Sequence, residues 1–502
     1  MDKVLPAVLF LVTIISRGLF PSHYLYHWDS VNFAFAIVDF DIAKEQPQPP
    51  GYILYVLLVR GINVLVHNAN LAMVLVSILA SALAVIMLYL LGRELFNLQT
   101  GILAALFLLI SPLFWFYGEI ALPHTLDAFL VILVAYWGWR VLKGEQQYLY
   151  LETGTLAIAS GVRPQTLLFL LPVYLFSIHR VPLKKIILAG LLGFLICLAW
   201  FVPMIQDTGG LTRYLEVMDQ FSMRFQESTS IFLGAGAFGL VRNLTKLALY
   251  SGYGVGLAAV PFAARLVFRR RVPGELEDRR MAYVFLVLWT APAFLYYLFV
   301  HMGQQGLVFV YLPAILIFGA WVGDRLMRSY GTPAQVLIAA CIVLNGAIFV
   351  LAPEFPLPGR SSIRLLTRQT IQQSDVYLHS RIAAIEENFS PANTSILATN
   401  WHHVEYYLPQ FKVIEFDIGS KWEIDAGEPT SVGTVQVGSD DLLLQGQAGT
   451  AIVLFDPELS EFNQSPQETR SLKLAEGQAL EYFQVEGAET FLLEGGTFRL
   501  VP

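Results

Sequence analysis

Residues 27–51 read HWDSVNFAFAIVDFDIAKEQPQPPG and follow the first long hydrophobic stretch of the chain. The segment places Asp29 just beyond that stretch and ends in a proline-rich turn, Gln-Pro-Pro-Gly, at residues 48–51. A carboxylate where a membrane helix meets water, beside such a turn and several aromatic residues, suits a general base that acts on a lipid-borne substrate. The segment therefore favours a membrane enzyme.

The composition is that of a helical membrane protein. The 502-residue chain is 55% hydrophobic, and its apolar stretches repeatedly reach the roughly 20 residues that cross a bilayer. We expect an all-α polytopic membrane domain at residues 1–352, with a break at 161–164 that makes two short helices of the stretch 149–178. With that pair, about 11 spans are predicted. The other nine are 4–20, 70–92, 100–117, 125–142, 184–204, 247–268, 280–300, 307–326 and 333–352.

Residues 353–502 differ in character from the rest of the chain. They follow a proline-rich linker and carry a net charge of −12, against +5 for the remainder. The acidic charge argues against nucleic-acid binding, because nothing there would neutralise phosphates. Short alternating segments predict a soluble α/β or α+β domain. Its expected strands are 395–399, 413–416, 433–437 and 451–455, with a helix at 402–407.

Basic residues in the short connections fix the expected orientation. The positive-inside rule places them in the cytoplasm, so the N-terminus is expected there and the acidic domain outside, in a plasma (inner) membrane protein. This count treats 52–66 as an interfacial helix that lies along the membrane, with a true span as the alternative. The basic residues are Arg93, Arg140, Lys143, Arg180, Lys184, Lys185, Arg269, Arg270, Arg271, Arg279, Arg280, Arg325 and Arg328.

Acidic and polar residues gather at the outer ends of the predicted spans. Glu119 follows the span 100–117, where an ionisable side chain is costly unless it is solvated or paired. It would orient an acceptor or share a metal, or it is a plain loop carboxylate. His124 and Asp127 lie one turn apart on the next helix. They would line the same cavity, although helix capping and a local hydrogen bond explain them as well.

Cations at the same face are candidates for binding a phosphate. Arg163 lies at the helix break, where it would hold a lipid phosphate through paired hydrogen bonds or satisfy carbonyls exposed by the following proline. Gln165 is a polar neighbour. Arg242 and Lys246 share one helix face, and they would clamp a phosphate or pyrophosphate or extend toward lipid headgroups.

A polar turn precedes the last two spans. It contains His301, Gln304 and Gln305 ahead of a glycine. Three hydrogen-bonding side chains at one helix junction would recognise phosphate or sugar hydroxyls. The turn is also expected to be polar simply because it is wet.

Taken together, these features resemble the GT-C superfamily of membrane glycosyltransferases, which includes protein O-mannosyltransferases and lipid A aminoarabinose transferases. The resemblance covers about residues 1–350 and rests on HWDS at 27–30, QPPG at 48–51, GRELF at 92–96 and the segment 117–127. It implies transfer of a sugar from a polyprenyl-phosphate donor to a glycan, lipid or protein acceptor at the outer face. Asp29 would then deprotonate the acceptor hydroxyl, or it is the N-cap of the helix that follows.

The cofactor requirement is left open by the residues. Two or three carboxylates with water would hold Mg²⁺ or Mn²⁺, yet no tight acidic spacing is present, and the superfamily also includes metal-independent enzymes. The adjacent histidines 402 and 403 diverge by about 100° on a helix, which argues against a shared metal.

A transporter or lipid flippase is the competing class. Transporters place ionisable residues near the bilayer midplane and commonly show repeated halves. Here the acidic candidates gather at one surface, and no internal repeat is found. A scaffold that binds a partner through its outer domain is a third alternative, but about 11 spans exceed what anchoring needs.

Overall fold

The computed structural model describes residues 4–267, 279–357, 360–415, 442–445, 450–461, 463, 469–484, 489–493 and 496–501. Contacts divide the chain into two compact units. Unit 1 comprises Met1–His23, Ala36–Phe355 and Arg364–Ile371, and unit 2 comprises Tyr24–Phe35, Pro356–Ile363 and Gln372–Pro502. The division near residue 355 lies close to the domain boundary expected at 352. The segment that contains Asp29, however, groups with the C-terminal residues, which the sequence did not indicate.

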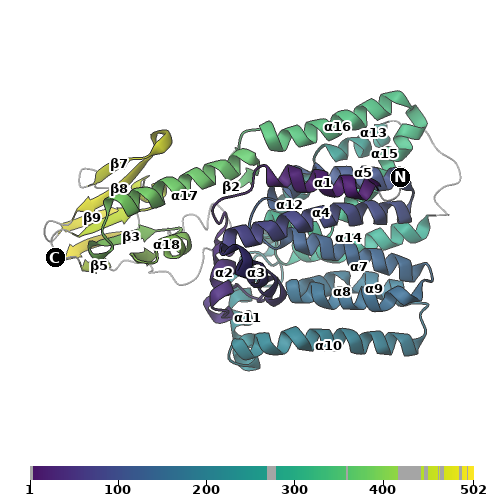
Figure 1. The fold of residues 1–502 in the computed structure, drawn as a ribbon, viewed down its shortest axis with the longest axis horizontal. Helices are drawn as coiled ribbons and strands as arrows, with labels where there is room; N and C mark the ends of the chain where they lie inside the picture. Colours follow the sequence, from purple (N-terminus) through teal and green to yellow (C-terminus); the bar gives the residue numbers. More distant parts are fainter. Residues whose placement is uncertain are drawn as a thin grey trace. The chain divides into compact units, whose positions relative to one another are not determined.

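Unit 1 is built of helices that run side by side in Figure 1, with α10 at one edge of the bundle. Helix α2 (Trp28–Val38) begins in unit 2 and ends in unit 1. The other helices of unit 1 are α1 (Val4–Gly18), η1 (Ile42–Lys44), α3 (Ile53–Val66), α4 (Ala69–Leu95), α5 (Leu98–Leu109), α6 (Pro112–Tyr117), α7 (His124–Leu142), η2 (Gln146–Tyr148), α8 (Leu149–Val162), α9 (Gln165–Ile178), α10 (Leu183–Asp207), α11 (Leu211–Gln226), α12 (Gly236–Val255), η3 (Gly256–Ala259), α13 (Val260–Val267), α14 (Arg280–Phe299), η4 (Gln305–Val310), α15 (Leu312–Tyr330) and α16 (Thr332–Leu351).

Six described helical segments are long and apolar enough to cross a membrane. Five shorter apolar helices accompany them, so the predicted number of spans stays a prediction. The rest of the protein covers these helices unequally. Of the most apolar 18 residues of each helix, 67% are buried in α4 but only 11% in α10. An apolar helix that leaves most of its surface uncovered requires lipid around it. The chain is therefore an integral membrane protein.

Three expected spans differ from the observed helices. The span 307–326 corresponds to the end of η4 followed by α15. The span 100–117 is divided into α5 and α6, because Pro112 has no N–H to continue the helical hydrogen bonds. The Ser111 hydroxyl accepts from the Phe114 N–H at the start of α6 and donates to Gly254 O at 2.6 Å. The span 247–268 is the second half of α12 followed by η3 and α13. Gly256, with φ of 54°, makes the turn there. Residues 205–246, which lie between two of the expected spans, contain α11 and the first half of α12.

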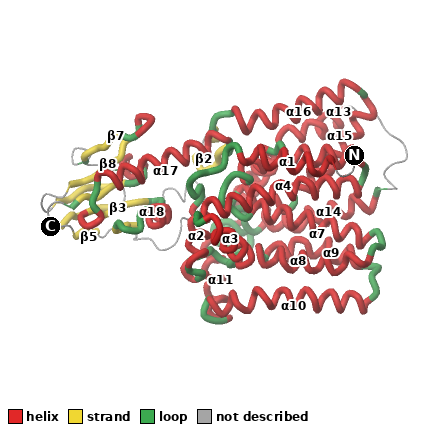
Figure 2. Tube along the Cα trace, in the orientation of Figure 1, coloured by secondary structure: helices red, strands yellow, loops and turns green. Residues whose placement is uncertain are grey.

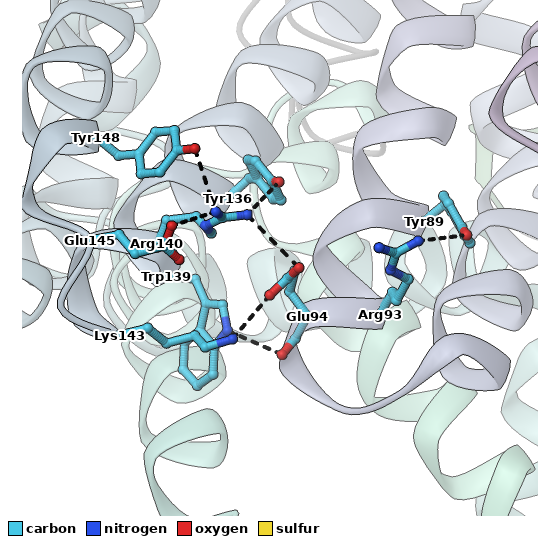
Figure 3. A network of polar contacts seen from close by, with 9 residues as sticks. All are labelled: Tyr89, Arg93, Glu94, Tyr136, Trp139, Arg140, Lys143, Glu145 and Tyr148. Carbon is cyan, nitrogen blue, oxygen red and sulfur yellow. Dashed lines mark hydrogen bonds and ion pairs between the residues drawn. The ribbon is translucent and has the colours of Figure 1, made fainter. Parts of the chain in front are cut away.

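A polar network joins the end of α4 to the end of α7 (Figure 3). Glu94 accepts a hydrogen bond from Lys143 Nζ at 3.1 Å, and its other carboxylate oxygen lies 3.9 Å from Arg140. Arg140 also pairs with Glu145. Arg140 and Lys143 are thus held by acidic partners from the end of α4 and from the turn after α7. Their cytoplasmic location is not tested by the structure, and the expected cations at 269–271 lie outside the described residues.

The strands that the structure describes belong to unit 2, except that β1 and β2 each include residues assigned to unit 1 (Figure 2). A five-stranded sheet has the order β4-β3-β6-β8-β7, in which β3 is parallel to β4 and β6, and β8 is antiparallel to both of its neighbours. A second sheet has the order β5-β10-β9. The elements are β1 (Phe355–Leu357), β2 (Arg360–Leu365), α17 (Arg368–Asn388), η5 (Pro391–Asn393), β3 (Thr394–Ala398), α18 (Trp401–Tyr407), β4 (Lys412–Glu415), β5 (Leu442–Gln445), β6 (Ala451–Leu454), α20 (Pro457–Glu461), β7 (Arg470–Lys473), η7 (Ala475–Gly477), β8 (Ala479–Gln484), β9 (Glu489–Leu493) and β10 (Gly496–Val501).

The predicted fold class is confirmed: a polytopic helical domain precedes a small domain that mixes helices and strands. Strands near 395, 413 and 451 and the helix near 402 are present as β3, β4, β6 and α18. The strand expected at 433–437 lies outside the described residues.

Candidate active site

Asp29 lies in the first turn of α2, within unit 2. The carbonyl of His27 accepts hydrogen bonds from the N–H groups of Ser30 and Val31, so His27 occupies the N-cap position. Asp29 is therefore not the helix cap. Its side chain is 15% exposed, and it stands where the N-terminal end of a helix stabilises negative charge.

His27 contacts Asp29 in two ways. The Asp29 N–H donates to His27 Nδ1 at 3.1 Å, and the same nitrogen lies 3.7 Å from the Asp29 carboxylate. Nδ1 of His27 therefore lies beside both the main chain and the side chain of Asp29 at the start of α2.

A buried ion pair connects α7 to the break between α8 and α9 in unit 1. Arg163 donates to Asp127 Oδ2 at 3.1 Å and to the Tyr297 hydroxyl at 3.0 Å. Thr166 donates to the other carboxylate oxygen at 2.8 Å. The Arg163 and Asp127 side chains are only 7% and 3% exposed. Loss of one partner of such a pair strongly lowers the stability of the protein, because the remaining charge stays buried.

His124 begins α7 and faces the polar turn that precedes η4. Its Nε2 and Gln304 Oε1 are 2.9 Å apart, and its ring meets the Tyr117 ring edge-on with centroids 5.0 Å apart. A Cβ at Gly306 would come within 2.6 Å of the histidine ring. The structure therefore brings together His124 and Gln304, and glycine at 306 allows that approach.

Arg242 and Lys246 lie on α12 and are buried, with 5% and 1% exposure. Arg242 donates to Asn243 Oδ1 at 3.1 Å and to Met302 O at 3.3 Å. His301 Nδ1 lies 3.1 Å from the Thr229 hydroxyl. The protein covers both side chains, which argues against the alternative that they extend toward lipid headgroups.

Glu119 follows α6 and is fully buried. Trp115 Nε1 donates to its Oε1 at 2.7 Å, and its Oε2 has no hydrogen-bond partner among the described residues. Burial raises the pKa of the Glu119 carboxyl well above its ordinary value, while Arg17 of α1 opposes that shift. The two acidic candidates stand in different units, Asp29 in unit 2 and Glu119 in unit 1.

Two unsatisfied polar atoms mark the helix break. Arg163 Nε and Gln165 Oε1 are buried and make no hydrogen bond within the described residues. A buried donor and a buried acceptor two positions apart normally find a partner. A binding role for Arg163 and Gln165 stays a prediction.

The described residues do not fit a metal. They contain no group of three or more His, Cys, Asp or Glu side chains that would hold an ion. Mg²⁺ and Mn²⁺ are bound by several oxygen ligands, and Asp and Glu carboxylates are the charged side chains that supply them.

Three residues of this network were missed from the sequence. Tyr297 lies in an apolar run, and Thr166 follows the break without a distinguishing pattern. Asn243 lies in an Asn-Leu-Thr triplet, and its amide nitrogen donates to Thr229 O at 3.0 Å and to Leu298 O at 3.2 Å in the interior. A polar residue between two cations on an apolar helix was the available signal for Asn243.

Comparison with known proteins agrees with this architecture. Residues 48–206 match the family model of dolichyl-phosphate-mannose-protein mannosyltransferases. ArnT from Cupriavidus metallidurans bound to undecaprenyl phosphate superposes with a TM-score of 0.58 and 14% identity, over 96% of this chain and 97% of that chain. The apo state of ArnT gives 0.59 and 13%, over 97% and 99%. The chain has the GT-C fold.

The expected resemblance to GT-C glycosyltransferases is thus confirmed for the fold over nearly the whole chain, and residues 48–206 match the mannosyltransferase family model. The family match includes Glu119, Asp127 and Arg163 but not Asp29. A weaker likeness is to the oligosaccharyltransferase of Archaeoglobus fulgidus, with a TM-score of 0.46 and 12% identity, over 83% of this chain and 64% of that chain. No curated protein matches the sequence at a significant level.

Proposed function

We propose that this protein transfers a sugar from a polyprenyl-phosphate donor to an acceptor hydroxyl at the outer face of the membrane, with inversion at the anomeric carbon. The observation that carries the proposal is the likeness of both units, over almost their full length, to ArnT bound to undecaprenyl phosphate. The family match to enzymes that use dolichyl-phosphate-mannose supports the same donor class. Acceptors of this class are glycans, lipids or proteins.

Asp29 is proposed as the general base. Its carboxylate takes the proton of the acceptor hydroxyl as that oxygen forms a bond to the anomeric carbon. The bond from the anomeric carbon to the phosphate oxygen breaks, and its electron pair leaves with the polyprenyl phosphate. One direct displacement inverts the configuration and needs no enzyme nucleophile. The place of Asp29 in the first turn of α2, with its side chain 15% exposed, supports this role.

Arg163 is proposed to hold the donor phosphate. Its guanidinium is fixed by Asp127 and Tyr297, and its Nε remains available as a donor among the described residues. A planar guanidinium binds phosphate oxygens in a defined geometry. Asp127, held in turn by Thr166, would orient Arg163 rather than touch the donor.

The polar turn and α12 are proposed to complete the binding of the donor. Arg242 and Lys246 add buried positive charge, and His124 with Gln304 adds hydrogen-bonding groups for sugar hydroxyls. Glu119 would orient the acceptor. Gln165, Gln305 and His301 are proposed as further polar contacts.

Cells that differ only in this protein test the proposal. Lipid-linked sugars and surface glycans would be compared in cells with the protein, cells without it, and cells with the Asp29→Asn variant. We expect one glycan modification to disappear and one polyprenyl-linked sugar to accumulate in both deficient strains. Unchanged glycans, with an altered distribution of the lipid-linked sugar between the two leaflets, would favour a flippase and contradict the enzyme.

A further inference from the structure

Helix α18 binds the main chain of the segment that contains Asp29. The Leu25 N–H donates to the Tyr407 hydroxyl at 2.8 Å, and the Leu25 carbonyl lies 2.8 Å from His403 Nε2. His403 and Tyr407 are four residues apart and so lie on one face of the helix. Both polar groups of a fully buried main-chain residue are thus satisfied by two side chains of α18, all within unit 2.

Ring contacts extend this attachment on both sides of Leu25. Tyr24 meets Tyr407 edge-on with centroids 5.1 Å apart, and Trp28 meets His402 edge-on at 5.6 Å. Edge-to-face pairs of this kind add stabilisation beyond the area that they bury. Asp29 therefore directly follows a residue that packs on α18.

Helix α17 holds the same segment at a second point. The Tyr24 N–H donates to Asp375 Oδ1 at 3.1 Å, and its hydroxyl lies 2.8 Å from His379 Nδ1. The segment is thus fixed by side chains of two helices, α17 and α18.

The start of α18 is itself fixed to the sheet. Asp456, which follows β6, accepts hydrogen bonds from the N–H groups of Thr399 at 2.6 Å and Asn400 at 3.0 Å. Tyr377 of α17 donates to the same carboxylate at 2.6 Å. A continuous set of bonds therefore leads from the sheet core through α18 to Leu25, four residues before Asp29 (the sheet and α18 are seen in Figure 1).

His403 is suited to a constant hydrogen bond. A carbonyl can only accept, so Nε2 carries the proton, and Nδ1 has no hydrogen-bond partner among the described residues. Burial lowers the pKa of His403 to about 4. The imidazole is therefore neutral throughout the physiological range, and its bond to Leu25 does not depend on pH there.

We propose that His403 and Tyr407 are positioning residues for the transfer reaction, which hold the main chain of Leu25 and thereby place the Asp29 carboxylate. This inference rests on the proposed role of Asp29 as the general base. It assigns the C-terminal domain a direct part in catalysis, beyond acting as an outer appendage. The side chains themselves need not touch either substrate.

Steady-state kinetics of single variants is the first test. Tyr407→Phe keeps the ring but removes the acceptor for the Leu25 N–H, and His403→Leu removes the donor to its carbonyl. We expect each to lower kcat about threefold to tenfold, the effect of one hydrogen bond, with an unchanged KM for the donor. His403→Gln retains an amide donor and should recover most of kcat. Tyr406→Phe is the matched control, since its hydroxyl makes no described hydrogen bond, and it should keep normal kcat.

A double-mutant cycle separates positioning from general stability. If Tyr407 acts through Asp29, Tyr407→Phe should cause no further loss of kcat in the Asp29→Asn background. An equal loss of kcat from Tyr407→Phe in the wild-type and Asp29→Asn backgrounds would overturn the positioning role alone. The same holds if Tyr407→Phe and His403→Leu keep normal kcat while Asp29→Asn is inactive. Normal kcat for Asp29→Asn would instead overturn the proposed base. Thermal unfolding of each variant confirms that the fold is retained.

Discussion

Replacing Arg163 is the perturbation that best separates substrate binding from structural support in unit 1. Arg163→Gln alone leaves Asp127 buried with only Thr166 as a described hydrogen-bond partner. Removing one partner of a buried ion pair costs about 3–5 kcal/mol of stability. The double variant Arg163→Gln with Asp127→Asn removes both charges, and the amide oxygen of Asn still accepts from Thr166. We expect the double variant to recover most of that stability.

The KM for the polyprenyl-phosphate donor should respond differently from the stability of the protein. A charged hydrogen bond to phosphate contributes about 1.5–3 kcal/mol, so its loss raises the donor KM by roughly 10- to 150-fold. Both the single and the double variant should show this rise, with a smaller change for the acceptor. The assay is thermal unfolding in detergent, together with kinetics in which each substrate is varied in turn.

The control is an arginine whose own side chain is exposed. Arg328 is 60% exposed and donates to Asp324 at 3.0 Å, and the buried Asp324 carboxylate also accepts a hydrogen bond from Asn97 at 2.9 Å. Arg328→Gln should therefore cost less stability than Arg163→Gln and leave both KM values unchanged. A double variant that regains normal stability and also normal donor KM would refute the phosphate role. Arg163 would then only support the helix break.

Three further outcomes are expected. Gly101→Ala should destabilise unit 1 by about 1–3 kcal/mol, because a Cβ at Gly101 would come within 2.5 Å of Tyr89 O. Gly190→Ala has open space around it and should not destabilise the protein, so equal unfolding temperatures for the two variants would contradict close packing at Gly101. The stability of unit 2 should fall as the pH is lowered from about 6.5 towards 4, because His403 takes up a proton in the unfolded chain but not in the folded one, where burial lowers its pKa to about 4. His403→Gln should remove about 3 kcal/mol of this pH dependence, and identical pH profiles for the variant and the wild type would refute it. Protease added to intact cells should cut residues 353–502, and complete protection until the membrane is broken would contradict the predicted topology.

The fold class was predictable because it depends on patterns that are local in sequence. Apolar stretches of membrane length and short alternating segments determine the helical domain and the mixed domain, respectively. The break at Ser111 and Pro112 was missed, because the apolar run continues through it and hydropathy alone does not register a proline. The serine-proline pair is the signal that marks such a helix start.

The pairing of site residues was not predictable, since it depends on contacts between distant parts of the chain. Asp127 and Arg163 were candidates, but nothing in the sequence pairs them. His124 and Gln304 are 180 residues apart, and His403 and Leu25 are 378 apart. Residues that hold a candidate through tertiary contacts, such as Tyr297 and Tyr407, look like ordinary aromatic residues until the fold is known.

The central claim is tested most directly by purified protein with a polyprenyl-phosphate sugar and an acceptor, in the wild-type and Asp29→Asn forms. Asparagine keeps the shape of the side chain and cannot take the proton, so we expect transfer by the wild type and a rate lower by about 10² to 10⁴ in a variant that unfolds at the same temperature. Near-normal turnover by Asp29→Asn would contradict the account by removing Asp29 from the mechanism.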